Sequence, residues 1–304
     1  MHMLKQQNRK LFTVVAILML ISNIFFFSVK LFGQEKQEQV KSGYAPANGL
    51  KMYYEIHGAG QPTILIHGGF GSLDMFGPNL TELAKNRQVI AIDLQAHGRT
   101  ADIDRPMSFE AFADDIAELL KYLKIQKADI VGYSVGGSTA IQFAIRHPEM
   151  ARKVVAVSCG FNNSGFYPEI RTQQKQIVPQ NAEGMKQLPL YQNYTKLAPR
   201  PQDWPILITK LGRLINKEFD YSNDIKNIKV PIMLIYGDAD LIAPVHAIAF
   251  FALLGGGQRD GGWDGSGVSN ARLAILPGIT HYNIFISPAL PQMIVPYLDA
   301  EGNR

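Results

Sequence analysis

Residues 128–141 read ADIVGYSVGGSTAI, and this stretch decides the fold class. An apolar run ends at Tyr133 and an amphipathic helical pattern starts at Val135, so Ser134 stands where a strand passes into a helix. The pentapeptide around Ser134 is G-x-S-x-G, whose small residues allow the strained turn that lifts a serine hydroxyl clear of a sheet. The stretch therefore predicts a strand, a sharp turn carrying a nucleophilic serine, and a helix.

Short apolar runs alternate with helical patterns along the rest of the chain. Further strands are expected at residues 63–66, 88–93, 153–158, 232–236 and 271–276. Between Phe109 and Leu123 the apolar residues recur at spacings of three and four, as on a helix that packs against a sheet. Runs rich in β-branched residues and separated by amphipathic segments indicate strand-helix-strand units. We therefore predict an α/β fold with a mostly parallel sheet and helices on both faces.

A base and an acid for Ser134 follow two later strands. A serine hydroxyl is a weak nucleophile, so it needs a base to accept its proton and an acid to orient that base. The strand run IMLIYG leads into Asp238 and Asp240, and the last strand run is followed by P-G-I-T-H, which ends at His281. His246 lies on a helical pattern, where a solvated or packed histidine is expected. The order serine, aspartate, histidine predicts a catalytic triad at the edge where the strands end.

Residues 51–299 resemble the α/β-hydrolase superfamily, in which the triad has this chain order. In the superfamily's G-D-x-D stretch the second acid orients the histidine, so the resemblance implies Asp240 as the acid and Asp238 as a turn residue. The stretch P-G-x-x-H implies His281 as the base. Serine at position 134 distinguishes the chain from haloalkane dehalogenases and epoxide hydrolases, which resemble this fold but carry an aspartate there.

The resemblance extends to the loop HGGFG at residues 67–71. In the superfamily a backbone N–H of this H-G loop supplies half of the oxyanion hole. The resemblance implies Gly69 as that donor, with Phe70 as the second choice, beside the N–H of Val135. It also implies that His67 is a structural residue of the loop and not a base.

Two further segments that contain glycine are expected to be structural. Residues 93–100, DLQAHGRT, resemble the superfamily's D-x-x-G-H-G-x-S element with Ala96 in place of a glycine, and we assign them no catalytic role. Residues 255–267, GGGQRDGGWDGSG, have neither GK[ST] nor the alternating oxygen ligands of a calcium loop. They lie between a predicted helix and a strand, which indicates a connection away from the strand ends that bind ligands.

A long insertion at residues 160–222 is expected to cap the site. It separates two predicted strands by more than an ordinary crossover and carries eight aromatic side chains. A helical cap over the strand ends would exclude water and contact the remote part of a substrate, and we expect Trp204 and Tyr194 to make such contacts. The alternative is a helical excursion that buries its own aromatic side chains.

The sequence predicts a serine hydrolase that cleaves carboxylic esters or lactones through an acyl-enzyme intermediate. The insertion has no acidic cluster, which favours a neutral or apolar ester over a peptide amine. Residues 252–267 and 271–285 also resemble bacterial esterases that open macrolide lactones, which would imply antibiotic resistance. The alternatives are a carbon-carbon bond hydrolase or a perhydrolase of the same fold, and, in a different class, a noncatalytic hydrolase-like binding protein.

Neither a cofactor nor a nucleic-acid partner is expected. The single cysteine, Cys159, cannot close an intramolecular disulfide, and no Cys/His cluster has the spacing of a zinc site. Of the 30 Lys and Arg and 26 Asp and Glu residues, five bases and two acids lie in the first 40 positions. The remainder is nearly neutral, which excludes binding driven by phosphate neutralisation.

The amino-terminal region predicts a membrane segment. Residues 11–29 carry no charge and follow three basic residues, and a bilayer-spanning helix needs about 20 apolar residues. We expect a signal anchor over residues 1–33, a linker over 34–47 and a hydrolase domain over 48–304 on the noncytoplasmic side, in the periplasm if the source is Gram-negative. The alternative is a cleaved signal peptide and a secreted enzyme.

Overall fold

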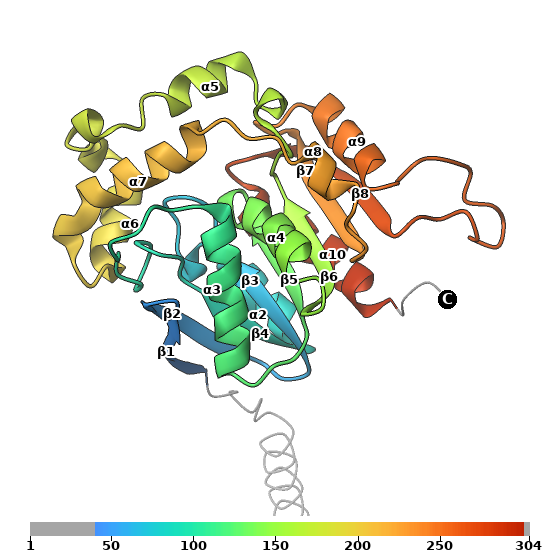
Figure 1. Cartoon of the computed structure of the whole chain (residues 1–304), viewed down its shortest axis with the longest axis horizontal. Coiled ribbons are helices and arrows are strands. Elements are labelled where there is room, and N and C mark those ends of the chain that lie inside the picture. Colours follow the sequence, from blue (N-terminus) through green and yellow to red (C-terminus); the bar gives the residue numbers. More distant parts are fainter. Residues whose placement is uncertain (1–39, 301–304) are drawn as a thin grey trace, which may run out of the picture. The chain divides into compact units, whose positions relative to one another are not determined.

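A computed structural model describes residues 40–300, which form an eight-stranded sheet with helices on both faces (Figure 1). The strands lie in the order β1-β2-β4-β3-β5-β6-β7-β8. β2 pairs antiparallel with both β1 and β4, and the other neighbours are parallel, which confirms the predicted α/β class. The strands are β1 Lys41–Ala47, β2 Leu50–His57, β3 Gln61–Ile66, β4 Arg87–Ile92, β5 Ala128–Tyr133, β6 Ala151–Val157, β7 Ile232–Ala239 and β8 Ala271–Thr280.

Two hydrophobic cores lie on opposite faces of this sheet. Along β5, Ile130 belongs to one core and Val131 to the other, because successive side chains of a strand point to opposite faces. Helices α3, α4 and α9 cover the first core, and α2 and α10 cover the second. The helices are α2 Pro78–Ala84, α3 Phe109–Tyr122, α4 Val135–Arg146, α5 Pro168–Gln174, α6 Pro189–Leu197, α7 Trp204–Asn216, α8 Ser222–Ile225, α9 Pro244–Leu253 and α10 Ala289–Asp299. Burial on both faces explains why the strands are continuous apolar runs.

The antiparallel hairpin of β1 and β2 corrects one prediction. Residues 41–47, expected to belong to a linker, form β1 at the edge of the sheet. Ala45 and Ala47 are fully buried while Tyr44 and Pro46 between and beside them are exposed, so only one face of β1 meets the core. Proline is tolerated at such an edge because one side of the strand needs no hydrogen-bonded partner.

The predicted anchor at residues 1–33 and the part of the predicted linker before residue 40 lie outside the described residues. Within residues 40–300 no helix is both long and apolar enough to cross a bilayer.

The insertion between β6 and β7 forms a layer of short helices, α5 to α8, at the end of the domain where α4 begins (Figure 1). It has an aromatic centre of its own. Trp204 is 1% exposed, and its indole Nε1–H donates a 2.9 Å hydrogen bond to the carbonyl of Ala182. The rings of Tyr191 and Tyr194 lie 5.2 and 5.3 Å from it, centroid to centroid. The glycine-rich residues 255–267 connect α9 to β8, as predicted.

Gly212 holds α7 against the segment before it, and this contact gives a test of the cap's packing. A Cβ at Gly212 would collide with the backbone carbonyl of Ile177, whereas a Cβ at Gly184 would meet nothing within 4 Å. We expect Gly212→Ala to lower the free energy of unfolding in urea by about 1–3 kcal/mol, as overpacking does. The matched variant Gly184→Ala should leave it unchanged or slightly higher. Equal values for the two variants would contradict this account.

Candidate active site

Ser134 lies in a strained turn between β5 and α4. Its φ of 55° and ψ of −115° are sparsely populated by residues with a side chain. The flanking glycines are required by close backbone packing. A Cβ at Gly132 would collide with the carbonyl of Gly136, and a Cβ at Gly136 would collide with the carbonyl of Ile66 at the end of β3. The predicted strand, turn and helix are all present.

The structure brings together the three residues of the predicted triad. His281 follows β8 and Asp240 follows β7, so both lie at the same sheet edge as Ser134. The distance from His281 Nε2 to Ser134 Oγ is 3.2 Å, and that from His281 Nδ1 to Asp240 Oδ1 is 2.9 Å. An ionised carboxylate only accepts hydrogen bonds, so Nδ1 carries the proton of the neutral ring and Nε2 is left to accept from Ser134. This arrangement can remove a proton from a serine hydroxyl.

The two candidate acids have different environments. Asp240 is buried and accepts from His281, whereas Asp238 is exposed and accepts from the backbone N–H of Gly278 at 2.8 Å. Asp238 therefore accepts a backbone hydrogen bond, as expected, but it belongs to strand β7 and not to a turn. Burial acts to raise the pKa of Asp240, but the hydrogen bond and charge of His281 and the hydroxyl of Ser158 outweigh it and lower the pKa. Asp240 is ionised at neutral pH.

Ser158 and Tyr133 hold the acid and the histidine in place, and the sequence did not identify either role. The hydroxyl of Ser158 donates to Asp240 Oδ2, and the N–H of Ile242 donates to Oδ1 at 3.3 Å. The hydroxyl of Tyr133 donates to the backbone carbonyl of His281 at 2.7 Å, and burial raises the pKa of this phenol. The only signal for Ser158 is its place directly after a strand, which many serines share.

The loop after β3 lies against the turn at Ser134. A Cβ at Gly68 would lie 3.3 Å from Ser134 Cβ, and one at Gly69 would lie 3.2 Å from Val135 Cγ2. Within the described chain the N–H groups of Gly69 and Phe70 have no hydrogen-bond acceptor. Val135 is the first residue of α4, where helix N–H groups lack intrahelical partners. These donors are available for the oxygen of a substrate carbonyl.

His67 is a structural part of this loop, as the superfamily resemblance implies. Its Nε2 accepts from the N–H of Leu94 at 3.0 Å, so Nδ1 carries the proton and donates to the carbonyl of Gly68 at 2.7 Å. Burial lowers the pKa of His67 to about 4, so the ring is neutral at neutral pH. Because both ring nitrogens of His67 are engaged in hydrogen bonds to the backbone, this histidine cannot serve as the base.

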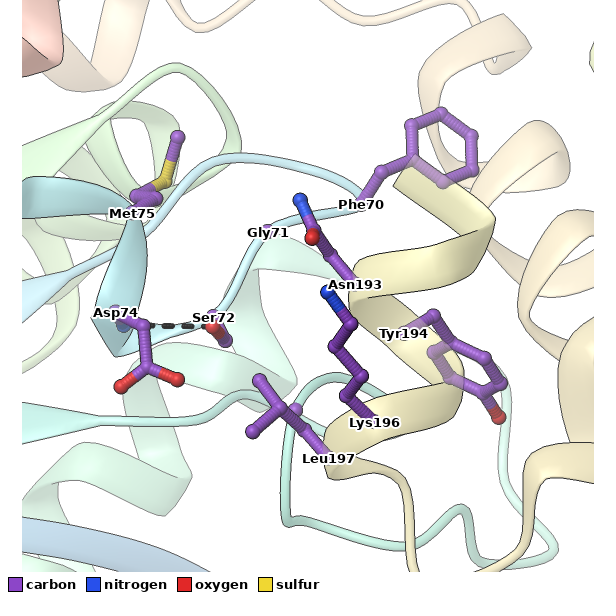
Figure 2. Close-up of a pocket in the computed structure, with 10 residues that line it drawn as sticks. Phe70, Gly71, Ser72, Asp74, Met75, Asn193, Tyr194, Lys196 and Leu197 are labelled. Atoms are coloured by element: carbon purple, nitrogen blue, oxygen red, sulfur yellow. Dashed lines mark hydrogen bonds between the residues drawn. The ribbon is translucent and has the colours of Figure 1, made fainter. Parts of the chain in front are cut away.

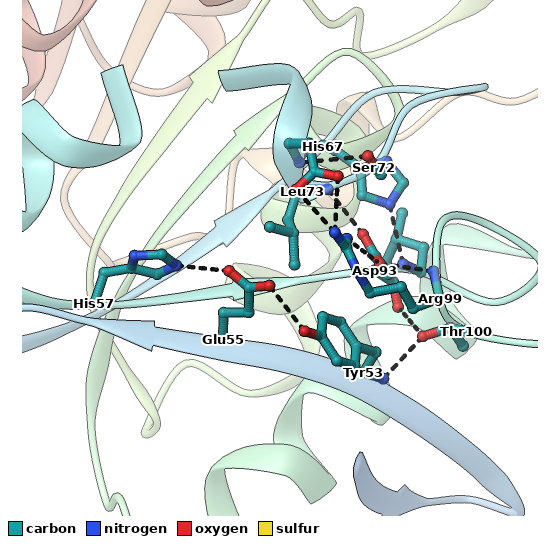
Figure 3. A network of polar contacts seen from close by, with 11 residues as sticks. Tyr53, Glu55, His57, His67, Ser72, Leu73, Asp93, Arg99 and Thr100 are labelled. Carbon is teal, nitrogen blue, oxygen red and sulfur yellow. Dashed lines mark hydrogen bonds and ion pairs between the residues drawn. The ribbon is translucent and has the colours of Figure 1, made fainter. Parts of the chain in front are cut away.

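Asp93 organises the adjacent loop at residues 93–100 (Figure 3). Its carboxylate accepts from the backbone N–H groups of Leu73 and Arg99, each at 2.8 Å, and it pairs with the Arg99 guanidinium at 3.4 Å. Burial nevertheless raises the pKa of Asp93 to about 6. Ala96, which replaces the superfamily's glycine, has a φ of 62°, the left-handed conformation that glycine adopts most easily.

A cavity of about 950 Å³ opens at Ser134. Its wall combines the loop after β3, the triad serine and histidine, and mainly aliphatic and amide side chains from the cap. The cap contributes Ile170, Gln173, Gln174, Ile177, Pro189, Leu190, Asn193, Leu211 and Ile215. Within residues 40–300, no group of three or more His, Cys, Asp and Glu side chains is placed to hold a metal ion.

The predicted cap contacts, Trp204 and Tyr194, do not line this cavity. Trp204 is buried in the cap's own centre, so the prediction that it contacts substrate is wrong and the alternative describes it better. Tyr194 is also buried and lines only a smaller pocket beside this cavity. Trp204 lies behind Phe70, with 6.2 Å between ring centroids, and Phe70 lines the cavity in its place.

Comparisons with known proteins agree with this fold. A family model described as the alpha/beta hydrolase fold matches residues 61–204. The chain is 25% identical to a non-heme haloperoxidase of Rhodococcus erythropolis over 268 residues, covering 77% of this chain and 90% of that protein. Its fold is similar to that of a thermophilic esterase from Thermogutta terrifontis, with a TM-score of 0.65, 19% identity and coverage of 86% and 98%. It is also similar to that of a membrane phospholipase A described as a novel bacterial virulence factor, with a TM-score of 0.67, 17% identity and coverage of 96% and 98%.

His246, the other histidine of this region, is buried on α9, where its ring stacks on Phe161 at 4.1 Å and its Nε2 accepts from the Phe161 N–H at 3.1 Å. Burial lowers the pKa of His246 from 6.5 to about 4, so between these values the unfolded chain binds a proton that the folded chain does not. Stability should therefore be lost as the pH falls through this window, by up to about 1.4 kcal/mol per pH unit.

His246→Gln should remove this part of the pH dependence. Urea unfolding at pH 7.5, 6.0 and 5.0 measures the free energy of unfolding of both proteins. The wild-type protein should lose stability relative to the variant as the pH falls. Parallel curves for the two proteins would show that His246 is not a buried neutral group.

Proposed function

Because the chain is a hydrolase of the α/β-hydrolase superfamily, we propose that it cleaves carboxylic esters or lactones with Ser134 as the nucleophile. The observation that carries this proposal is the continuous hydrogen-bonded series from Ser134 through His281 to Asp240. The same order of serine, base and acid activates the nucleophile in unrelated serine hydrolases.

The proposed mechanism has two halves. Ser134 Oγ attacks the acyl carbonyl while His281 Nε2 takes its proton, and the same proton then passes to the leaving alcohol as the ester bond breaks. Water next attacks the acyl-enzyme and gives a proton to His281, which passes it to Ser134 Oγ as the bond to the acyl group breaks and the acid is released. Asp240 stays ionised and holds the imidazole in its orientation. The N–H groups of Val135 and Gly69, or Phe70 as the second choice, stabilise the oxyanion in both halves.

The lining of the cavity supports an apolar acyl or alcohol group. Ile170, Ile177 and Leu211 line the same cavity as Ser134 with aliphatic side chains, and the volume of about 950 Å³ is at the upper end of the usual range for small-molecule sites, about 300–1,000 Å³. In its most specific form, the proposal takes a macrocyclic lactone such as a macrolide antibiotic as the substrate. A carbon-carbon bond hydrolase or a perhydrolase would use the same triad and is the alternative.

We further propose that residues 1–33 anchor the enzyme in a membrane, with the hydrolase domain on the noncytoplasmic side. The support is the uncharged stretch 11–29 behind Lys5, Arg9 and Lys10. The similarity in fold to a membrane phospholipase A is compatible with this location. Cleavage of the segment and secretion is the alternative.

Triad variants test the proposed chemistry. We expect Ser134→Ala and His281→Ala each to lower kcat on p-nitrophenyl butyrate by roughly 10⁴- to 10⁶-fold, and Asp240→Asn by about 10⁴-fold. Asp238→Asn is the matched control and should retain most activity, since within residues 40–300 its carboxylate accepts a hydrogen bond only from the N–H of Gly278. Melting temperatures of all four proteins verify that they fold.

Three outcomes would contradict the assignment. Asp238→Asn could prove more damaging than Asp240→Asn, Ser134→Ala could keep its activity, or the wild-type protein could hydrolyse none of a short aryl ester, a simple lactone and a macrocyclic lactone. In the last case, turnover of a carbon-carbon bond substrate or perhydrolysis in the same assay series would support the alternative. Turnover of the first two substrates without the third would exclude only the macrolide form.

The membrane proposal predicts the fate of the domain in whole cells. Protease added to spheroplasts that express the full chain should remove the hydrolase domain, detected by immunoblot, while a cytoplasmic marker protein stays intact. Protection of the domain would overturn the predicted orientation. Recovery of activity in the soluble fraction, with a new amino terminus near residue 34, would show cleavage and secretion instead.

A further inference from the structure

A second pocket adjoins the cavity at Ser134 (Figure 2). Its volume is about 300 Å³, and it lies between the loop after β3 and helix α6 of the cap. The two spaces share four lining residues, Phe70, Gly71, Met75 and Asn193. A substrate whose carbonyl lies at Ser134 could therefore extend past these four residues into the second pocket. We call this second pocket the side pocket.

The side pocket is more polar than the cavity beside it. Ser72, Asp74 and Lys196 line it without lining the cavity, together with Leu197 and the ring of Tyr194. The hydroxyl of Tyr194 is directed away from the pocket, toward the backbone carbonyl of Arg200 at 3.4 Å (Figure 2). The polar side chains that can contact a ligand in this pocket are therefore those of Ser72, Asp74, Lys196 and Asn193.

Four charged side chains lie in or beside the side pocket, and of these only Lys196 has no partner of opposite charge among residues 40–300. Asp74 is matched by Arg99, whose Nη2 lies 3.0 and 3.2 Å from its two carboxylate oxygens, and Arg99 also pairs with the buried Asp93. Lys196 lies in the last turn of α6. Among residues 40–300 its ammonium has no carboxylate within 4 Å and no hydrogen-bond acceptor, although it carries three donors.

We propose that the side pocket binds a carboxylate on the substrate, remote from the bond that is cleaved, through Lys196. This inference rests on the proposed function, and it names the substrate class as esters or lactones with an anionic arm. Lys196 donates charge-assisted hydrogen bonds to the carboxylate. The side-chain amide of Asn193, on the preceding turn of α6 and on the wall of both spaces, is placed to contact the arm where it enters.

A kinetic comparison tests the role of Lys196. The substrates are mono-p-nitrophenyl esters of succinic, adipic and suberic acid, each paired with the same ester whose free carboxyl is methylated. For the chain length that fits best, Lys196→Gln should lower kcat/KM on the free acid about tenfold, the effect of losing one charged hydrogen bond, and leave the methylated ester unchanged. Added salt should reduce the wild-type preference for the acid.

Lys175→Gln is the matched control, because Lys175 is another exposed cap lysine and lines neither space. It should leave both esters unchanged. Lys196→Glu should reverse the preference and favour an ester with a terminal amine over the acid. An equal loss on the acid and the methylated ester with Lys196→Gln, or no loss on either, would overturn the proposal.

A binding measurement separates this proposal from the proposed function. Calorimetry on Ser134→Ala with monomethyl suberate, which has one free carboxylate, should show binding that weakens about tenfold when Lys196→Gln is added. If no ester is hydrolysed but this difference is found, the side pocket stands and the proposed chemistry fails. If neutral esters are hydrolysed through Ser134 and Lys196→Gln changes neither kinetics nor binding, the chemistry stands and the side pocket proposal fails.

Discussion

The contact between the turn at Ser134 and the carbonyl end of β3 is the constraint on which the site depends. Gly136 packs so closely on the carbonyls of Ile66 and His67 that a Cβ would not fit. This packing offsets the strain of a residue with φ of 55° and ψ of −115°, a conformation that costs about 1–3 kcal/mol. The same interface positions both sets of oxyanion donors, because Val135 begins α4 and Gly69 follows β3. The proposed nucleophile and the proposed oxyanion donors are thus held by the same packing contact.

The acid and the base reach Ser134 from the other half of the sheet. Because β5 to β8 are parallel, their carboxyl ends meet at one edge, and Ser158, Asp240 and His281 follow three of them. Tyr133 connects the halves, since it precedes the nucleophile and hydrogen-bonds the backbone of His281. The lowered pKa of Asp240 keeps its charge down to acidic pH, so this contact contributes stability above the usual aspartate range and loses it as the pH falls through the lowered value.

The parts of the site that the sequence predicted are those where chemistry and backbone geometry leave few choices. G-x-S-x-G needs glycine on both sides of Ser134, and the carboxylate and imidazole had to follow strands, so the three residues and the sheet around them could be placed. Strand β1 was missed because it lies at the edge of the sheet, buries only the small residues Ala45 and Ala47 and carries Pro46. The position of Trp204 was predicted wrongly because an aromatic residue in a sequence is expected to be buried. The sequence does not show whether its side chain faces the cavity or the interior of the cap.

The cap contributes to the site differently from the sheet, because it supplies cavity wall and not the residues of the predicted triad. Phe70 joins the two, because its backbone belongs to the loop that the turn at Ser134 holds, while its ring packs toward Trp204 and forms part of the wall of both spaces. The opposite walls come from α5, α6 and α7, which touch no triad side chain by hydrogen bond in the described chain. A change at Lys196 would therefore alter the side pocket, which adjoins the cavity at Ser134, without removing a hydrogen bond of the serine, the histidine or the acid. In the proposed mechanism the strand ends therefore carry the reaction chemistry, and the cap, which supplies much of the remaining wall of the cavity, would set selectivity.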